Sequence, residues 1–181
     1  SAMITTVAST KPHENTAFER FVGNGSIALL PIAEQKFKLV WIASTELIKS
    51  FVNQSESEIF EGLKIGFGKR IGQFHTLGSE RLIYPLRRVQ VEKQVQNGFV
   101  LMGNAAHALH PIAAQGFNLS LREIAVFIDV LDQAIKSGKD FSSEECLQGY
   151  FGKCFFDQKR TLFFTESLAS FFSKDSWVAN R

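Results

Sequence analysis

The chain has 181 residues, of which 45% are hydrophobic and 21% charged, and its formal net charge is +2. This length is sufficient for one sizeable core or two small ones. The weak net charge, with no run of Lys and Arg, argues against nucleic acid as a partner. No apolar run approaches the ~20 residues of a membrane span, and no secretory leader opens the chain, so we expect a cytoplasmic protein.

The first half of the chain predicts an antiparallel sheet with two helices. Strands are predicted at 4–9, 17–22, 26–32 and 37–42, and further strands at 71–77 and 81–89 return to the sheet. Ser44 or Thr45 caps a helix that runs to about Asn53, and Ser55 or Ser57 caps a second helix that runs to about Phe67.

Two glycine patterns in this half imitate nucleotide-binding motifs. Residues 23–28 formally match Gly-x-Gly-x-x-Gly/Ala, which requires a helix at the second glycine, but Pro31 would interrupt that helix. We therefore predict a hairpin there. Residues 62–70 suggest a P-loop, yet the glycine spacing differs and Arg70 stands where Ser or Thr is needed, so we reject that motif.

The rest of the chain is organised around residues 97–119. Residues 99–102 are an apolar run that predicts a short buried strand of a parallel sheet. Residues 103–106 carry almost no side-chain bulk, so a ligand could lie against their backbone. After Pro111, residues 115–118 lead into an amphipathic helix, whose first N–H groups favour anionic or carbonyl oxygens.

Two long helices are predicted to follow. In the first, apolar residues keep helical spacing up to Ser137-Gly138; they are Leu121, Ile124, Ala125, Ile128, Leu131 and Ile135. Ser142 and Glu145 suggest a capping box for a final helix of about thirty residues that is rich in Phe. Cys146 and Cys154 lie eight apart on this helix, about 12 Å between Cα atoms, so both are predicted to be free thiols. No metal site is predicted, because the four histidines lack ligands at suitable spacing.

The stretch Gly103-Asn104-Ala105-Ala106-His107, with Pro111 and residues 115–119, resembles a flavin-binding signature of the FAD-dependent aromatic hydroxylases. The usual form of that signature is Gly-Asp-Ala-Ala-His, then Pro, then Gly-Gln-Gly-x-Asn. Residues 17–21, 25, 28–31, 39–41 and 84–86 are also similar to the substrate domain of this family, and most similar to the ubiquinone-biosynthesis hydroxylases that act on polyprenylated phenols such as 2-polyprenyl-6-methoxyphenol.

The resemblance implies a cofactor role for each matching position. Asn104 replaces the acidic residue that hydrogen-bonds the ribityl chain, and its carboxamide keeps one acceptor oxygen. Pro111 would lie beside the isoalloxazine ring, and the N–H groups of residues 116–118 would hold the oxygens of its pyrimidine. Ala114 replaces a glycine, which would cost roughly 1 kcal/mol if φ is positive there. The implied cofactor-binding residues are Gly103, Asn104, Pro111, Gln115, Gly116, Phe117 and Asn118.

The resemblance also implies an α/β fold that is α+β within this chain. Residues 4–90 would supply the antiparallel sheet and helices of a substrate domain. Residues 91–181 would supply the C-terminal strand, the flavin-contacting turn and the long helices of an FAD-binding domain. An N-terminal βαβ unit that seats the ADP half of FAD would be missing. We therefore expect this chain to be the C-terminal part of a longer hydroxylase and to bind little or no FAD alone.

For the intact enzyme, the resemblance implies FAD-dependent hydroxylation of a polyprenylated phenol in ubiquinone biosynthesis with NAD(P)H and O₂. The cofactor carries that chemistry, so no catalytic side chain is named, and His107 and His110 are expected to shape the turn. The expected partners are the substrate, the missing N-terminal half and other ubiquinone-biosynthesis proteins at the surface of the inner membrane. Two alternatives stay open: a non-catalytic interaction or assembly module, and a flavin reductase of the same fold.

Overall fold

The computed structural model describes residues 1–23, 25–111 and 114–173, which form a mixed α/β structure. Asn24, Ile112, Ala113 and the residues after Ser173 lie outside this description. The chain divides into two units: unit 1 contains residues 1–86 together with 170–181, and unit 2 contains residues 87–169. The assignment of residues 4–90 and 91–181 to two domains of a hydroxylase remains a prediction.

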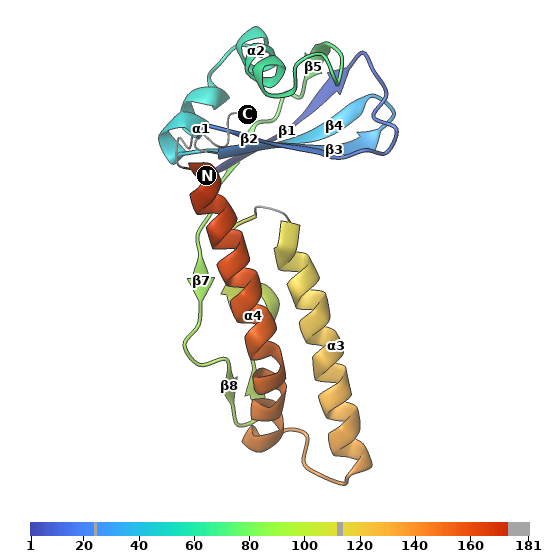
Figure 1. Ribbon diagram of the computed structural model, residues 1–181, viewed down its shortest axis with the longest axis vertical. Coiled ribbons are helices and arrows are strands. Elements are labelled where there is room, and N and C mark those ends of the chain that lie inside the picture. The colour runs from blue at the N-terminus through green and yellow to red at the C-terminus, as the bar shows by residue number, and fades with distance from the viewer. Residues whose placement is uncertain (24, 112–113, 174–181) are drawn as a thin grey trace. The chain divides into compact units, whose positions relative to one another are not determined.

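Unit 1 is an antiparallel sheet with two helices on one face (Figure 1). Its elements are β1 (Ala2–Ser9), β2 (Phe18–Val22), β3 (Gly25–Ala33), β4 (Lys36–Ile42), α1 (Thr45–Val52), α2 (Glu56–Phe67), β5 (Phe74–Leu77) and β6 (Leu82–Tyr84). The strand order is β2-β3-β4-β1-β5, and β6 also pairs with β1. The predicted sheet is therefore confirmed, with β1 inserted between β4 and β5.

Alternation along the strands builds the core of unit 1. Every second residue of β3 and β4 points to the helices, so Ile27, Leu29, Phe37 and Leu39 are fully buried. They pack with Ile48 and Phe51 of α1 and with Ile59 and Leu63 of α2. Ser44 caps α1 by accepting from the Leu47 N–H, and Ser55 and Glu58 form a capping box on α2.

Neither of the two glycine-rich segments, at residues 23–28 and 62–70, forms a nucleotide-binding loop. Val22 and Gly25 face each other across the hairpin that joins β2 to β3, which confirms the predicted hairpin. Residues 62–67 are the C-terminal half of α2. The predicted strand at 81–89 is divided into β6 and β7, because Pro85 has no N–H to donate to a ladder.

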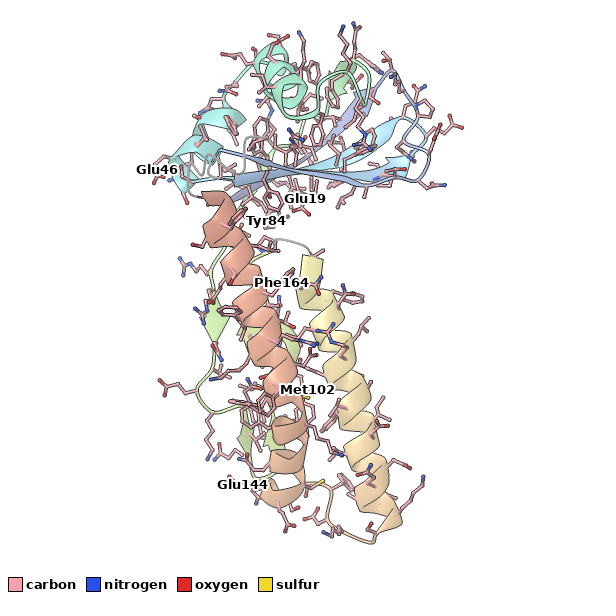
Figure 2. All side chains as sticks on the ribbon, viewed as in Figure 1. Glu19, Glu46, Tyr84, Met102, Glu144 and Phe164 are labelled. Atoms are coloured by element: carbon pink, nitrogen blue, oxygen red, sulfur yellow. The ribbon has the colours of Figure 1, made fainter. Side chains whose placement is uncertain are left out.

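Among the residues that the structure describes, unit 2 has two long helices, four short strands and one 3₁₀ turn. Its elements are β7 (Val89–Gln90), β8 (Val95–Gln96), β9 (Phe99–Val100), η1 (Gly103–Ala105), β10 (His107–Ala108), α3 (Gln115–Lys136) and α4 (Glu144–Ser173) up to residue 169. Helices α3 and α4 lie side by side (Figure 1). Val130 packs on Tyr150 and Cys154, and the Phe127 and Tyr150 rings meet edge to face, with centroids 5.2 Å apart. Met102, labelled in Figure 2, packs against the same cluster.

Two expectations for unit 2 are wrong in detail. Phe99 is exposed, and β9 pairs antiparallel with β8, because Gly98 takes a left-handed φ of 68° and turns the chain back on itself. It is therefore not a buried strand of a parallel sheet. Ser143, not Ser142, caps α4: its Oγ accepts from the Cys146 N–H at 3.3 Å, whereas Ser142 bonds to Asp140.

The helical spacing predicted for α3 is confirmed, and the structure shows which of its faces is buried. The predicted apolar positions Leu121, Ile124, Ile128 and Ile135 are exposed, while Leu119, Glu123, Val130 and Ala134 are buried. Within the described residues, the face of α3 that packs against the rest of unit 2 is therefore not the face that carries most of the predicted apolar positions. Among the helices described here, none is both long and apolar enough to cross a membrane.

Candidate functional site

The turn at Gly103 depends on the absence of a side chain. Met102 is extended, and Gly103 then adopts a left-handed φ of 54° at the start of η1. A Cβ atom at Gly103 would lie 2.9 Å from Ser120 Oγ on α3. The Ala106 N–H closes the turn on the Gly103 carbonyl at 2.9 Å. Gly103 is therefore buried against α3, while Asn104 and Ala105 stay exposed.

The start of α3 forms the second predicted segment. Ala114, at the N-cap, has a left-handed φ of 48° and no side chain that can cap the helix. The Ala114 N–H donates to the Pro111 carbonyl at 3.1 Å. Gly116 is half-buried, whereas Phe117 and Asn118 are exposed. The helix thus begins with backbone N–H groups that its N-cap side chain leaves uncapped, and Ala114 carries the strain expected for a non-glycine residue.

The two predicted segments lie together in unit 2. The turn of η1 packs on Ser120, which is one helical turn after Gly116, and Ser120 Oγ donates back to the Gly116 carbonyl at 3.0 Å. Exposed Asn104 and exposed Phe117 therefore belong to neighbouring elements. Pro111 is also exposed, and Gln115 is half-buried. The part of the connection at Ile112 and Ala113 lies outside the described residues.

A buried polar network behind the turn was missed by the sequence analysis. Glu123 and His107 are 2% and 1% exposed, and Glu123 Oε1 lies 2.6 Å from His107 Nε2. Glu123 Oε2 accepts from the Gly103 N–H at 3.1 Å, and Oε1 also accepts from Gln158 Nε2 at 2.6 Å. Gln158 in turn exchanges two hydrogen bonds with Gln94, at 3.0 and 3.1 Å. The network therefore joins residues of η1, β10, α3 and α4 and the residue before β8.

These contacts decide the charge of Glu123. Burial by itself would raise its pKa, but hydrogen bonds from His107, Gln158 and the Gly103 N–H outweigh burial and hold the pKa below its ordinary value. Because an ionised carboxylate only accepts, His107 donates through Nε2, and its buried Nδ1 has no partner among the described residues. The sequence offers one local signal: Glu123 is four residues after apolar Leu119, on the same helical face.

Burial shifts the pKa values of three other titratable groups in unit 2. Burial raises the pKa of the Tyr150 hydroxyl and raises that of the Cys154 thiol to about 11. Burial lowers the pKa of half-buried His110. Cys146 and Cys154 are both free, as predicted. No trio of His, Cys, Asp or Glu side chains within residues 1–23, 25–111 and 114–173 is arranged to hold a metal ion.

Comparison with known proteins decides the family. The family model described as "FAD binding domain" matches residues 3–147, which is most of the chain. This chain belongs to the FAD-binding-domain family. The resemblance seen in the Gly103–Asn118 residues is thereby confirmed at the level of the family.

The curated relatives that this chain matches are much longer than the chain itself. It is 30% identical over 175 residues to the ubiquinone hydroxylase UbiL of Rhodospirillum rubrum, covering 97% of this chain and 41% of UbiL. It is 31% identical over 150 residues to the 3-demethoxyubiquinol 3-hydroxylase of Escherichia coli, covering 83% and 38%. An uncharacterized Synechocystis protein is 33% identical over 150 residues, covering 83% and 36%. The chain thus spans about two fifths of these relatives.

Several solved structures share this fold. PqsL from Pseudomonas aeruginosa, determined with 2-aminobenzoylacetate, superposes with a TM-score of 0.78 at 20% identity, covering 96% of this chain and 48% of PqsL. The flavin-dependent halogenase CmlS superposes with a TM-score of 0.65 at 17% identity, covering 99% and 34%. At these identities the likeness establishes the fold alone.

Proposed function

We propose that this chain is the C-terminal part of an FAD-dependent monooxygenase that hydroxylates a polyprenylated phenol in ubiquinone biosynthesis. The observation that carries the proposal is the match of residues 3–147 to the FAD-binding-domain family, together with the likeness to UbiL and to the E. coli hydroxylase. A substrate with a polyprenyl tail partitions into lipid, so the enzyme would work at the surface of the membrane. Residues 4–90 would form the substrate domain, and residues 91–181 would belong to the FAD domain.

The residues of the turn and helix start fit the ribityl chain and ring edge of FAD. The backbone at Gly103 and Ala105 is without bulk, and the exposed Asn104 carboxamide offers both an acceptor and a donor to a ribityl hydroxyl. The first N–H groups of α3, at Gly116 to Asn118, would hold the carbonyl oxygens of the flavin ring, where the helix dipole favours negative charge. Pro111 and Gln115 would line the same edge.

The protein would position the flavin and exclude water from its site. FAD, when bound and reduced by NAD(P)H, supplies the oxygen-activating chemistry. Residues of this chain would fix the flavin against the Gly103 turn and exclude water from the buried side of that turn. No side chain of this chain is assigned an acid–base role.

The test measures FAD content, NADPH oxidation and hydroxylated product in the longest natural form of the protein, with a polyprenylated phenol as substrate. We expect stoichiometric flavin and a product one oxygen heavier. Gly103→Val should remove the flavin, because a branched side chain at φ 54° is strained and meets Ser120. A flavin-free wild-type protein would refute the proposal.

Two other outcomes separate the alternatives. A flavin reductase of the same fold would oxidise NADPH under O₂ without hydroxylating the phenol. A non-catalytic module would bind a protein partner through exposed aromatic residues of α4, such as Phe156 and Phe163, with no affinity for flavin. The 181-residue chain alone is expected to bind little or no FAD.

A further inference from the structure

The Glu123 carboxylate is bonded to both ends of the turn that contains Asn104. At one end it accepts from the Gly103 N–H, and at the other it contacts the His107 ring. Two of the residues between them also make backbone bonds within the turn: the Ala105 N–H donates to the Met102 carbonyl, and the Ala106 N–H donates to the Gly103 carbonyl. Glu123 therefore acts as a brace across the whole of residues 103–107.

A buried carboxylate at this place needs a reason, because burial of a charge is costly unless it is fully paired. The neighbouring buried positions of α3 are apolar: Leu119, Val130 and Ala134. An apolar residue at position 123 would match them and remove the cost, but it could accept neither the Gly103 N–H nor a bond from His107. The carboxylate is thus explained by the groups it orients rather than by stability.

Hydrogen bonds from other side chains fix the position of the Glu123 carboxylate. Gln158 of α4 donates to Glu123 and is paired with Gln94 through both amide groups. These two amides and His107 fix the rotamer of the carboxylate from two sides, so that its Oε2 is aimed at the Gly103 N–H.

We infer that Glu123 is a positioning residue for flavin, which sets the turn from Gly103 to His107 so that Asn104 faces outward in a fixed orientation. This inference rests on the proposed function. Glu123 would not touch the cofactor. It would act through the turn, and it would determine affinity for flavin by preorganising backbone that FAD would otherwise have to order.

The experiment compares Glu123→Gln with a matched control, Asp157→Asn. Gln has the same size, but it loses the charge and one of the two acceptor oxygens. Asp157 bonds to Arg122 across the same two helices, at 2.6 and 3.3 Å, and does not contact the turn. Both variants weaken the contact between α3 and α4, and only the first disturbs the brace.

Two readouts are taken. Hydrogen exchange of the Gly103 amide, followed by NMR in this chain, should accelerate roughly 10- to 100-fold in Glu123→Gln, the range for a lost bond to a charged acceptor, and stay near wild type in Asp157→Asn. In the longest natural form, the FAD dissociation constant should rise about tenfold in Glu123→Gln only. If Glu123→Gln does not fold, Glu123→Asp, which retracts the carboxylate by one methylene, should show the same two changes.

The possible failures are distinct. An unchanged Gly103 exchange rate would overturn the brace itself. A faster exchange with unchanged FAD affinity, or an equal loss of affinity in Asp157→Asn, would overturn the positioning role and leave the proposed function standing. A wild-type protein that binds no FAD would refute both.

Discussion

Replacing Ala114 by glycine should stabilise the protein, although the same change in an ordinary helix destabilises it. Ala114 has a left-handed φ of 48°, which costs an L-residue about 1 to 2 kcal/mol. Glycine removes that strain but adds about 0.4 to 1 kcal/mol of chain entropy to the unfolded state. The net expectation is a stabilisation of about 0.5 to 1 kcal/mol.

The control is Ala125→Gly, an identical substitution at an exposed position inside α3. It should destabilise by about 1 kcal/mol, because φ there is helical and glycine is the poorer helix former. Urea unfolding followed by far-UV circular dichroism reports mainly on α3 and α4, the two longest helices. With a slope of about 2 kcal/mol per molar urea, the midpoints should move in opposite directions by about 0.3 to 0.5 M. A lower midpoint for Ala114→Gly would refute the strain at this turn.

Three further predictions concern both units. Arg81→Met should destabilise unit 1 by about 2 kcal/mol, because Arg81 Nη1 donates to three carbonyls at the end of α1. Unfolding followed by the fluorescence of Trp41, which contacts that helix, would measure this loss of stability. The folded pKa of Glu123 is held below the ordinary value for Glu, so its stabilisation should be present above that ordinary value and be lost as the pH falls through the lowered pKa; the loss of stability in acid should be smaller in Glu123→Gln. Under native conditions, iodoacetamide should modify half-buried Cys146 well before Cys154, whose thiol is buried and has a pKa near 11, as peptide mass spectrometry would show.

Most of the fold could be predicted from the sequence, because its signals are local. Alternating apolar residues determine the strands of unit 1, and the Ser55 to Glu58 spacing marks the start of α2 in the chain itself. The Gly103 turn was found for the same reason. Its left-handed φ of 54° favours glycine, and this preference is visible in the sequence itself.

What could not be predicted depends on contacts between distant residues. Periodicity shows that α3 is a helix, but it cannot say which side is covered, and the exposed Leu121 and Ile128 follow the same spacing as a buried stripe. Glu123 looked like an ordinary surface charge, since Gly103, His107 and Gln158 are 16 to 35 residues away in sequence. The local clue to the network is that Glu123 lies one helical turn after apolar Leu119.

The amide pair of Gln94 and Gln158 extends this network well beyond the turn. Proteolytic cleavage of the loop before β8, or local unfolding of that loop in mild denaturant, would therefore make the segment around Asn104 less ordered without contacting it. When its ligand binds, all the protease-sensitive sites of unit 2 should become resistant to limited digestion together. The reason is that its segments are joined through the Glu123 network and unfold cooperatively.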